Sequence, residues 1–129
     1  MAMVSIIDDD QRVREAMGGL VRALGYEVAT FESAEQFLES GCLAETSCLI
    51  TDVHMPGLNG LELHSHLVAN GYCTPVILVT AFPEERSRKR AMSAGAVGFL
   101  SKPFDESSLI RCLENAMNRT PVEEEKSAV

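Results

Sequence analysis

Met3-Val4-Ser5-Ile6-Ile7-Asp8-Asp9-Asp10 is a short apolar run that ends in three consecutive carboxylates. Four further short apolar runs follow along the chain, at Glu27–Phe31, Cys48–Thr51, Val76–Thr80 and Val97–Leu100. Runs of this length, apolar at neighbouring positions, are typical of strands buried on both faces of a parallel sheet. The sequence therefore predicts five strands, the first of which carries the aspartates at its carboxyl end.

Helical patterns separate these strands and follow the last one. The first helix has an apolar face made of Val13, Ala16, Met17, Leu20, Val21 and Leu24. Gly25 follows it as a terminating residue, and Ser33-Ala34-Glu35-Gln36 opens the second helix with capping-box spacing. Two more helices cover roughly residues 60–69 and 84–94. The last helix has an apolar face made of Leu109, Ile110, Leu113, Ala116 and Met117. This alternation predicts an α/β fold, a parallel sheet with helices on both faces.

The composition suits one compact domain. The chain has 129 residues, 46% of them hydrophobic, no tryptophan and a net charge of −8. That charge disfavours a nucleic-acid surface, because affinity for the phosphate backbone comes from Lys and Arg, and it favours cationic partners such as metal ions. We expect a domain over residues 1–119 and an acidic tail, or the start of a linker, over residues 120–129.

The four cysteines form no CxxC pair and show no zinc-like spacing with histidine. Cys48 and Cys112 fall in apolar patterns, so we expect buried free thiols, consistent with a reducing compartment. No apolar run approaches the roughly 20 residues that cross a bilayer, and no signal-peptide pattern opens the chain. We therefore expect a soluble cytoplasmic protein that makes no membrane contact.

Polar residues mark the carboxyl ends of the predicted strands. Asp8 and Asp9 follow the first strand, Asp52 ends the third, Thr80 ends the fourth and Lys102 follows the fifth. In an open α/β sheet, ligands bind at the carboxyl ends of the strands, where the strand order reverses. With strand order 2-1-3-4-5, that crevice lies between the first and third strands and brings the three aspartates together.

Such a cluster of carboxylates requires compensation. Two charges about 5 Å apart repel by roughly 3 kcal/mol at an effective dielectric of about 20, so the cluster needs a cation or a shifted pKa. An all-oxygen set with few protein ligands suits Mg²⁺, which keeps several waters and shares phosphate groups. The aspartate triplet alone fits a solvated acidic turn equally well. The coincidence of four strand ends favours the metal site.

Asp52 is a suitable nucleophile, because a carboxylate can form an acyl phosphate. Phosphoryl transfer depends mainly on positioning and charge neutralisation. Lys102 could neutralise one side of the phosphoryl oxygens and Mg²⁺ the other, while the Thr80 hydroxyl donates a hydrogen bond. Each residue alone has an ordinary explanation, since a lone lysine is usually solvated and a threonine at a strand end is usually a local cap.

Four separated segments carry a resemblance: Ile7-Asp8-Asp9-Asp10, Thr51-Asp52-Val53-His54-Met55-Pro56-Gly57, Val79-Thr80-Ala81 and Leu100-Ser101-Lys102-Pro103-Phe104. In order and spacing they closely resemble the response-regulator receiver domain, over residues 3 to about 119. The resemblance implies a flavodoxin-like (βα)5 doubly wound sheet with strand order 2-1-3-4-5. It also implies that a sensor histidine kinase phosphorylates Asp52, with Mg²⁺ or Mn²⁺ as cofactor.

The resemblance implies a metal set around Asp52. Asp8 and Asp9 would be the acidic pair, with Asp9 the direct ligand and Asp8 acting more through water. His54 would contribute its backbone carbonyl and not its side chain. Asp10, although part of the same triplet, is expected only to cap the first helix.

The resemblance also implies a switch. Thr80 and Lys102 would sense the phosphate, and Phe99 matches an aromatic position whose environment changes when Thr80 moves. The Lys102–Pro103 peptide bond would be cis, which X–Pro bonds tolerate in tight loops.

Softer signals point to a subgroup. Val13-Arg14, Phe31-Glu32-Ser33-Ala34 and Ala81-Phe82 are similar to FixJ-type regulators, whose receiver is joined to a LuxR-type helix-turn-helix. This implies control of transcription, with DNA contacted only through an output domain outside these residues, and a homodimer that forms on phosphorylation.

The fourth predicted helix is basic, carrying Arg86, Arg88, Lys89 and Arg90 with few large apolar residues. Charge alone favours a solvated face. The resemblance favours a displaceable surface, made of the fourth helix, fifth strand and fifth helix, that repacks on phosphorylation and meets a partner.

Two other functions stay open. A haloacid-dehalogenase-type phosphatase also uses an Asp nucleophile with Thr, Lys and Mg²⁺, but it normally places a second Asp two residues after the nucleophile, where this chain has His54. A binding module that has lost phosphorylation is the other, and the intact set of five polar residues speaks against it. The receiver hypothesis describes a switch and not an enzyme.

Overall fold

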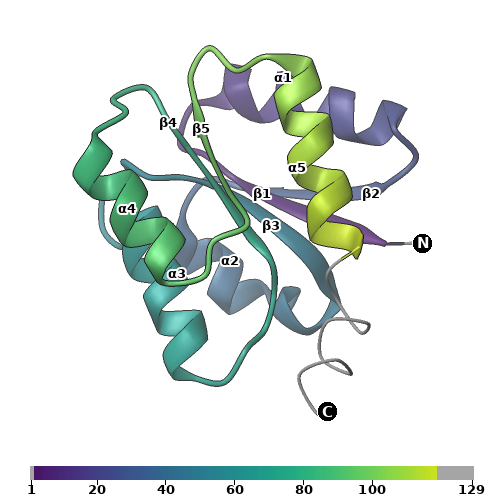
Figure 1. Ribbon diagram of the computed structural model, residues 1–129. Helices are drawn as coiled ribbons and strands as arrows, with labels where there is room; N and C mark the ends of the chain where they lie inside the picture. The colour runs from purple at the N-terminus through teal and green to yellow at the C-terminus, as the bar shows by residue number, and fades with distance from the viewer. Residues whose placement is uncertain (1, 119–129) are drawn as a thin grey trace, which may run out of the picture.

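A five-stranded parallel sheet forms the centre of the molecule, with helices on both faces (Figure 1). The computed structural model describes residues 2–118. The strands are β1 (Met3–Ile7), β2 (Glu27–Phe31), β3 (Thr46–Asp52), β4 (Val76–Thr80) and β5 (Gly98–Ser101). Their order is β2-β1-β3-β4-β5, which confirms the predicted doubly wound α/β topology. The predicted boundary at residue 119 and the tail over residues 120–129 lie outside the described residues.

The helices divide into two layers. They are α1 (Gln11–Ala23), α2 (Ala34–Ser40), α3 (Gly60–Ala69), α4 (Glu85–Ser93) and α5 (Glu106–Asn118), with a single 3-10 turn at Leu43–Glu45. Helices α1 and α5 cover one face of the sheet, and α2, α3 and α4 cover the other (Figure 1). No helix within residues 2–118 is long and apolar enough to cross a membrane.

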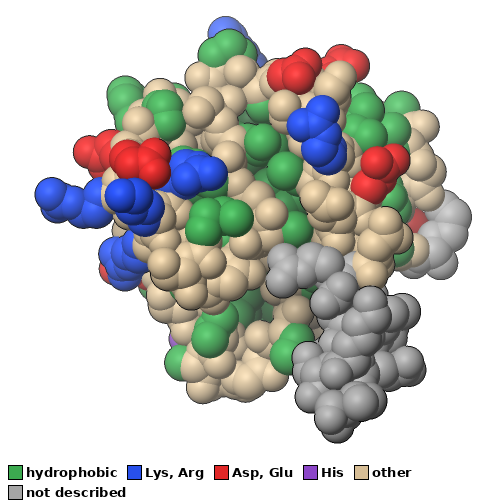
Figure 2. Space-filling model, viewed as in Figure 1, with side chains coloured by type: hydrophobic (Ala, Val, Ile, Leu, Met, Phe, Trp, Pro, Cys, Tyr) green, Lys and Arg blue, Asp and Glu red, His purple; other side chains and the backbone are tan. Residues whose placement is uncertain are grey.

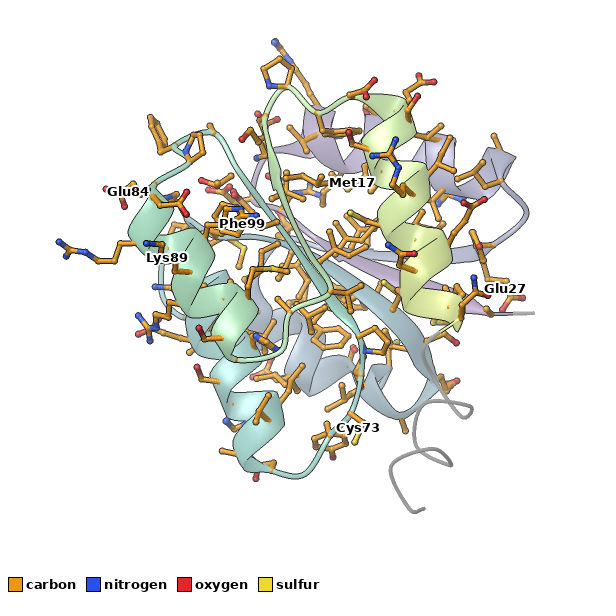
Figure 3. The ribbon with its side chains drawn as sticks, viewed as in Figure 1. Met17, Glu27, Cys73, Glu84, Lys89 and Phe99 are labelled. Atoms are coloured by element: carbon orange, nitrogen blue, oxygen red, sulfur yellow. The ribbon has the colours of Figure 1, made fainter. Side chains whose placement is uncertain are left out.

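Each face of the sheet buries its own hydrophobic cluster. On the α2–α4 face the largest buried side chain is Phe37, whose ring lies edge-on to Phe31 at a centroid distance of 5.2 Å. The α1–α5 face is almost wholly aliphatic and includes Met17 (Figure 3). Cys48 is buried there, as predicted. Cys112 is a free thiol, as predicted, but the expected burial is wrong: the residue lies beside Gly98 and is only partly buried.

The strand ends differ from prediction where pairing extends them. β3 is longer than expected at its amino end: it begins at Thr46, which pairs with Met3 of β1, and it ends at Asp52 as predicted. Asp52 itself is paired with Val79. The phosphoacceptor candidate is therefore the last residue of a central strand, as the sequence predicted.

Side chains cap the helices only in part as expected. The Oδ1 atom of Asp10 accepts a hydrogen bond from the Arg12 N–H at 2.9 Å, which confirms the predicted cap of α1. Ser33 Oγ accepts from the Gln36 N–H at 3.0 Å, but the Gln36 side chain returns to the Glu32 N–H, one residue earlier than a capping box requires.

Candidate functional site

Parallel pairing of neighbouring strands gathers the predicted polar residues at one edge of the sheet. Ile7 of β1 lies beside Thr51 of β3, so the residues that follow them, Asp8 and Asp52, emerge side by side. Thr80 ends β4 and pairs with Ser101 of β5.

Asp8, Asp9 and Asp52 form an acidic cluster at this edge. Each offers a carboxylate oxygen within 4.8 Å of the others. Asp8 is 1% exposed and Asp52 6% exposed, whereas Asp9 lies at the surface. Three anionic oxygen donors, two of them buried and one accessible, fit a hard divalent cation that completes its shell with water. The donor chemistry therefore suits Mg²⁺ or Mn²⁺.

Lys102 lies over the two buried carboxylates. Its Nζ atom donates a hydrogen bond to Asp8 Oδ2 at 2.8 Å and is 3.5 Å from Asp52 Oδ2. The hydrogen bond and the charges of the two aspartates outweigh desolvation and raise the pKa of Lys102. The ammonium group therefore remains charged and offsets part of the repulsion within the cluster.

Asp52 is held in a partly desolvated position. Burial, followed by the charge of Asp8, raises the pKa of its carboxyl, while Lys102 and a hydrogen bond from the His54 backbone N–H act in the opposite direction. The net result is a carboxylate that is less well solvated than an ordinary surface aspartate, beside a cation that offsets only part of this cost.

Thr80 is completely buried and already has a local partner. Its hydroxyl oxygen accepts a hydrogen bond from the Phe82 N–H at 3.0 Å, and its backbone carbonyl accepts from the Lys102 N–H at 2.7 Å. Phe99 packs partly buried against the core under α4 (Figure 3). The threonine thus connects the acidic cluster to the β4–α4 loop.

A family model described as the response regulator receiver domain matches residues 4–114. The chain belongs to this family. Receivers are signalling switches that bind Mg²⁺ at an acidic pocket and are phosphorylated by sensor histidine kinases. The chain is the receiver domain of a two-component response regulator.

Known relatives agree with this assignment. The receiver is 38% identical to the transcriptional regulatory protein FixJ of Azorhizobium caulinodans, covering 91% of this chain and 56% of the relative. It is also 38% identical to nodulation protein W of Bradyrhizobium diazoefficiens, covering 92% of this chain and 52% of that protein. The chain thus spans about half the length of these relatives.

Solved structures show the same fold. The response regulator StyR superposes with a TM-score of 0.88 at 36% identity, over 98% of this chain and 64% of StyR. The FixJ-N structure superposes with a TM-score of 0.81 at 32% identity, over 92% of this chain and 94% of that one.

Two loops hold further predicted residues of the receiver, His54 after β3 and Pro103 after β5. The His54 ring is exposed and meets Phe82 edge-to-face, with a centroid distance of 5.7 Å. The Lys102–Pro103 peptide bond is cis, as the resemblance implied. A Cβ atom at Gly60 would overlap the Asp52 carbonyl oxygen, so only glycine allows α3 to begin this close to the phosphoacceptor candidate.

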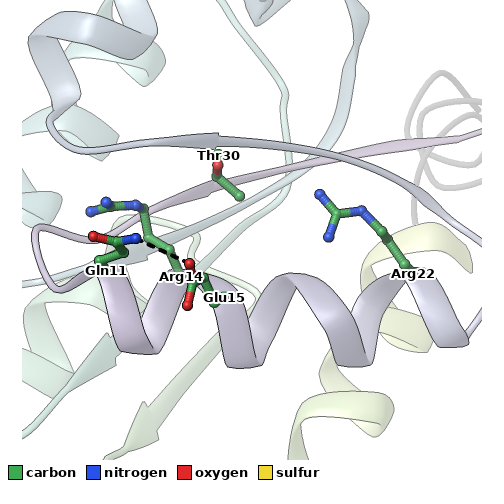
Figure 4. A pocket seen from close by; sticks show the side chains of 5 residues that line it. All are labelled: Gln11, Arg14, Glu15, Arg22 and Thr30. Atoms are coloured by element: carbon green, nitrogen blue, oxygen red, sulfur yellow. Dashed lines mark hydrogen bonds between the residues drawn. The ribbon is translucent and has the colours of Figure 1, made fainter.

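Two residues that support the site were not predicted. Arg14 of α1 donates from Nη1 to the Asp8 backbone carbonyl at 2.6 Å, and Glu35 of α2 accepts from the Leu58 N–H at 2.8 Å. Both contacts arise from the approach of separate elements, and nothing in the local sequence marks them. Arg14 also lines a polar groove of about 230 Å³ between α1 and β2, together with Gln11, Glu15, Arg22 and Thr30 (Figure 4).

Proposed function

We propose that Asp52 accepts a phosphoryl group from a sensor histidine kinase beside a divalent cation held by Asp8, Asp9, Asp52 and the backbone carbonyl of His54. The observation that carries this proposal is the cluster at the carboxyl edge, in which three aspartate oxygens lie within 4.8 Å and Lys102 Nζ reaches two of the carboxylates. Asp52 is the residue of this cluster that ends a central strand.

The proposed transfer is a displacement at phosphorus. An Oδ atom of Asp52 forms the new P–O bond, the P–N bond of a kinase phosphohistidine breaks, and its electron pair returns to the imidazole nitrogen. The His54 N–H orients the Asp52 carboxylate. A bound Mg²⁺ or Mn²⁺ would offset the negative charge of the phosphoryl oxygens.

Lys102 and Thr80 are proposed to respond to the phosphorylation of Asp52. The Lys102 ammonium would exchange its contact with the Asp52 carboxylate for one with the acyl phosphate. The Thr80 hydroxyl would leave the Phe82 N–H and donate to a phosphoryl oxygen, and Phe99 would repack into the space beside it. This exchange couples the phosphate to the β4–α4 loop.

Helix α4 is the element we expect to respond. Ala91 is its only buried residue, and its first residue lacks a side-chain cap. Lys and Arg side chains gather on its outer surface (Figure 2). The α4–β5–α5 surface would thus change shape on phosphorylation and bind a partner. One such partner is a second copy of this chain, which would give a homodimer.

The output is proposed to be transcriptional. Relatives with this receiver are named as transcriptional regulators, and the chain spans about half their length. DNA contact would therefore belong to a domain outside these residues. We expect no multiple turnover of phosphate monoesters, in contrast to a haloacid-dehalogenase-type phosphatase.

Intact-mass spectrometry tests the proposal. The protein is incubated with a small acyl-phosphate donor and Mg²⁺, and with a chelator in place of Mg²⁺. We expect one phosphoryl group on the wild type with Mg²⁺, and none on Asp52→Asn or with chelator. Asp10→Asn, which removes a carboxylate from the same aspartate-rich stretch but keeps the oxygen that caps α1, is the matched control and should be phosphorylated normally. Equal labelling of Asp52→Asn would refute the proposal.

A further inference from the structure

The loop that leads from Asp52 to α3 is closed at its base by backbone hydrogen bonds. The Val53 N–H donates to the Val79 carbonyl at 2.9 Å, and the Gly60 N–H donates to the Val53 carbonyl at 3.0 Å. Between these points, no backbone N–H of residues 54–58 donates to another backbone group of the described chain. The loop therefore depends on side chains for its shape.

Glu35 supplies one such side chain from a different element. Its Oε2 atom accepts a hydrogen bond from the Leu58 N–H at 2.8 Å, across 23 residues of sequence. Within the described chain, it is the only side chain from outside residues 52–62 that hydrogen-bonds to the backbone of residues 54–59. The Leu58 N–H and the residue's own backbone N–H lower the pKa of Glu35, so the acceptor stays ionised near neutral pH.

Gly57 lies close to the same Glu35 carboxylate. It has φ +76, and a Cβ atom placed on it would lie 2.7 Å from Glu35 Oε2. Glycine at this position therefore serves both the left-handed backbone and the close approach of Glu35. The contact therefore requires both the Glu35 carboxylate on α2 and a residue without a side chain at position 57 of the loop.

We propose that Glu35 is a positioning residue, which ties the β3–α3 loop to α2 and so holds the His54 backbone in place for the divalent cation and for Asp52. This inference rests on the proposed function of the acidic cluster. The His54 backbone N–H lowers the pKa of the Asp52 carboxyl, and the backbone carbonyl of His54 is the proposed metal ligand. Without the Leu58 hydrogen bond, the loop would be held by the Met55 and Leu58 side chains, which pack against the core, and by the backbone hydrogen bonds at its base.

The first test uses the metal-free protein and measures the tether itself. Amide hydrogen exchange at Leu58 is compared by NMR in the wild type, Glu35→Ala, Glu35→Gln and Glu39→Ala. Loss of the acceptor should speed exchange at Leu58 by about 10-fold or more in Glu35→Ala. Glu35→Gln keeps an oxygen acceptor and should retain most of the protection. Glu39 is exposed on the same helix and makes no hydrogen bond or ion pair within residues 2–118, so its variant should match the wild type.

The second test measures Mg²⁺ affinity from amide shifts at Val53 and His54 in the same variants. We expect Kd to rise by roughly 10-fold in Glu35→Ala, the lower end of the range for groups that orient metal ligands. Kd should stay within about 2-fold of the wild type in Glu35→Gln and Glu39→Ala, because neither removes the hydrogen-bond acceptor. An equal loss in Glu35→Gln and Glu35→Ala would show that charge and not the tether matters, and would overturn the inference.

The outcomes separate this inference from the proposed function. If wild-type protein binds Mg²⁺ and Glu35→Ala binds it equally well, the positioning role is wrong and the acidic cluster stands. If wild-type amides around Asp52 do not respond to Mg²⁺, the proposed metal site itself fails. Unchanged Leu58 exchange in Glu35→Ala would also overturn the tether, whatever the metal affinity.

Discussion

Asp52 is a residue whose ionised carboxylate is needed for the proposed phosphorylation but destabilises the folded protein. Its carboxyl is 6% exposed, and burial together with the charge of Asp8 raises its pKa. The folded state therefore binds the Asp52 proton more tightly than the unfolded state does. It follows that ionised Asp52 destabilises the metal-free fold at pH 7, and that this cost disappears as the pH falls below the unfolded value of about 3.9.

The variant Asp52→Asn should thus be more stable than the wild type in chelator at pH 7, by about 4 °C in Tm for each kcal/mol of cost removed. The difference should shrink towards zero as the pH falls to about 3, where the wild-type carboxyl is protonated. Circular dichroism melts at both pH values measure this, with the exposed Glu114→Gln as control. A lower Tm for Asp52→Asn at pH 7 would contradict the assignment of a desolvated carboxylate.

Glycine substitutions give a second comparison. Gly60→Ala places a Cβ atom onto the Asp52 carbonyl oxygen and should cost roughly 2–3 kcal/mol. Gly19→Ala meets nothing within 4 Å inside α1 and should stabilise by roughly 0.5–1 kcal/mol. Urea unfolding of both variants measures the difference, and equal effects would show that α3 does not need its close approach to Asp52.

At the residue scale, the sequence was sufficient to predict which polar residues gather at the carboxyl edge of the sheet, because strand ends converge in any parallel sheet. These residues are Asp8, Asp9, Asp52, Thr80 and Lys102. They were insufficient for contacts that separate elements create. The approach of Lys102 to Asp8, the Arg14 bond to the Asp8 carbonyl and the Glu35 tether each depend on how elements pack, which no local pattern encodes.

At the scale of elements, α3 and α4 differ in how firmly they are capped and packed against the sheet. Helix α3 begins with a complete capping box between Asn59 and Glu62 and buries Leu63 and Leu67. Helix α4 follows Glu84, which makes no cap hydrogen bond, and buries only Ala91. Hydrogen exchange should therefore be faster along α4 than along α3 in the metal-free, unphosphorylated protein.

A cap supplied to α4 should reverse part of this difference. Serine is a strong N-cap and glutamate a weak one, so Glu84→Ser should stabilise α4 by roughly 0.5–1 kcal/mol. Exchange within residues 86–93, measured by mass spectrometry, should slow several-fold while exchange in α3 stays unchanged. Equal protection of α3 and α4 in the wild type would remove the reason for treating α4 as the responsive element.

The order of helices and strands was predictable because apolar runs and helical patterns alternate without interruption. The boundaries were harder to predict: β3 begins earlier than expected, at Thr46, which pairs with Met3 of β1, and the end of α2 depends on Gly41 with φ +79. The weak attachment of α4 was visible in its composition, which has few large apolar residues.

At the scale of the whole molecule, the sheet places one acidic cluster at its carboxyl edge in a chain with net charge −8. A ligand that binds only the folded state stabilises it by about 2.7 kcal/mol at a concentration 100 times its Kd. Mg²⁺ should therefore raise Tm in a concentration-dependent way. Asp9→Ala, which removes the exposed donor and leaves the buried pair intact, should lose most of this gain. An identical Mg²⁺ response in Asp9→Ala would place the cation elsewhere.

The most direct measurement identifies the phosphorylated residue itself. The phosphorylated protein is reduced with borohydride, which converts an aspartyl phosphate to homoserine, and its peptides are sequenced by mass spectrometry. The proposed function predicts homoserine at position 52 in the wild type, dependent on Mg²⁺ and absent from Asp52→Asn. Homoserine at Asp8 or Asp9, or phosphate retained on another side chain, would contradict it.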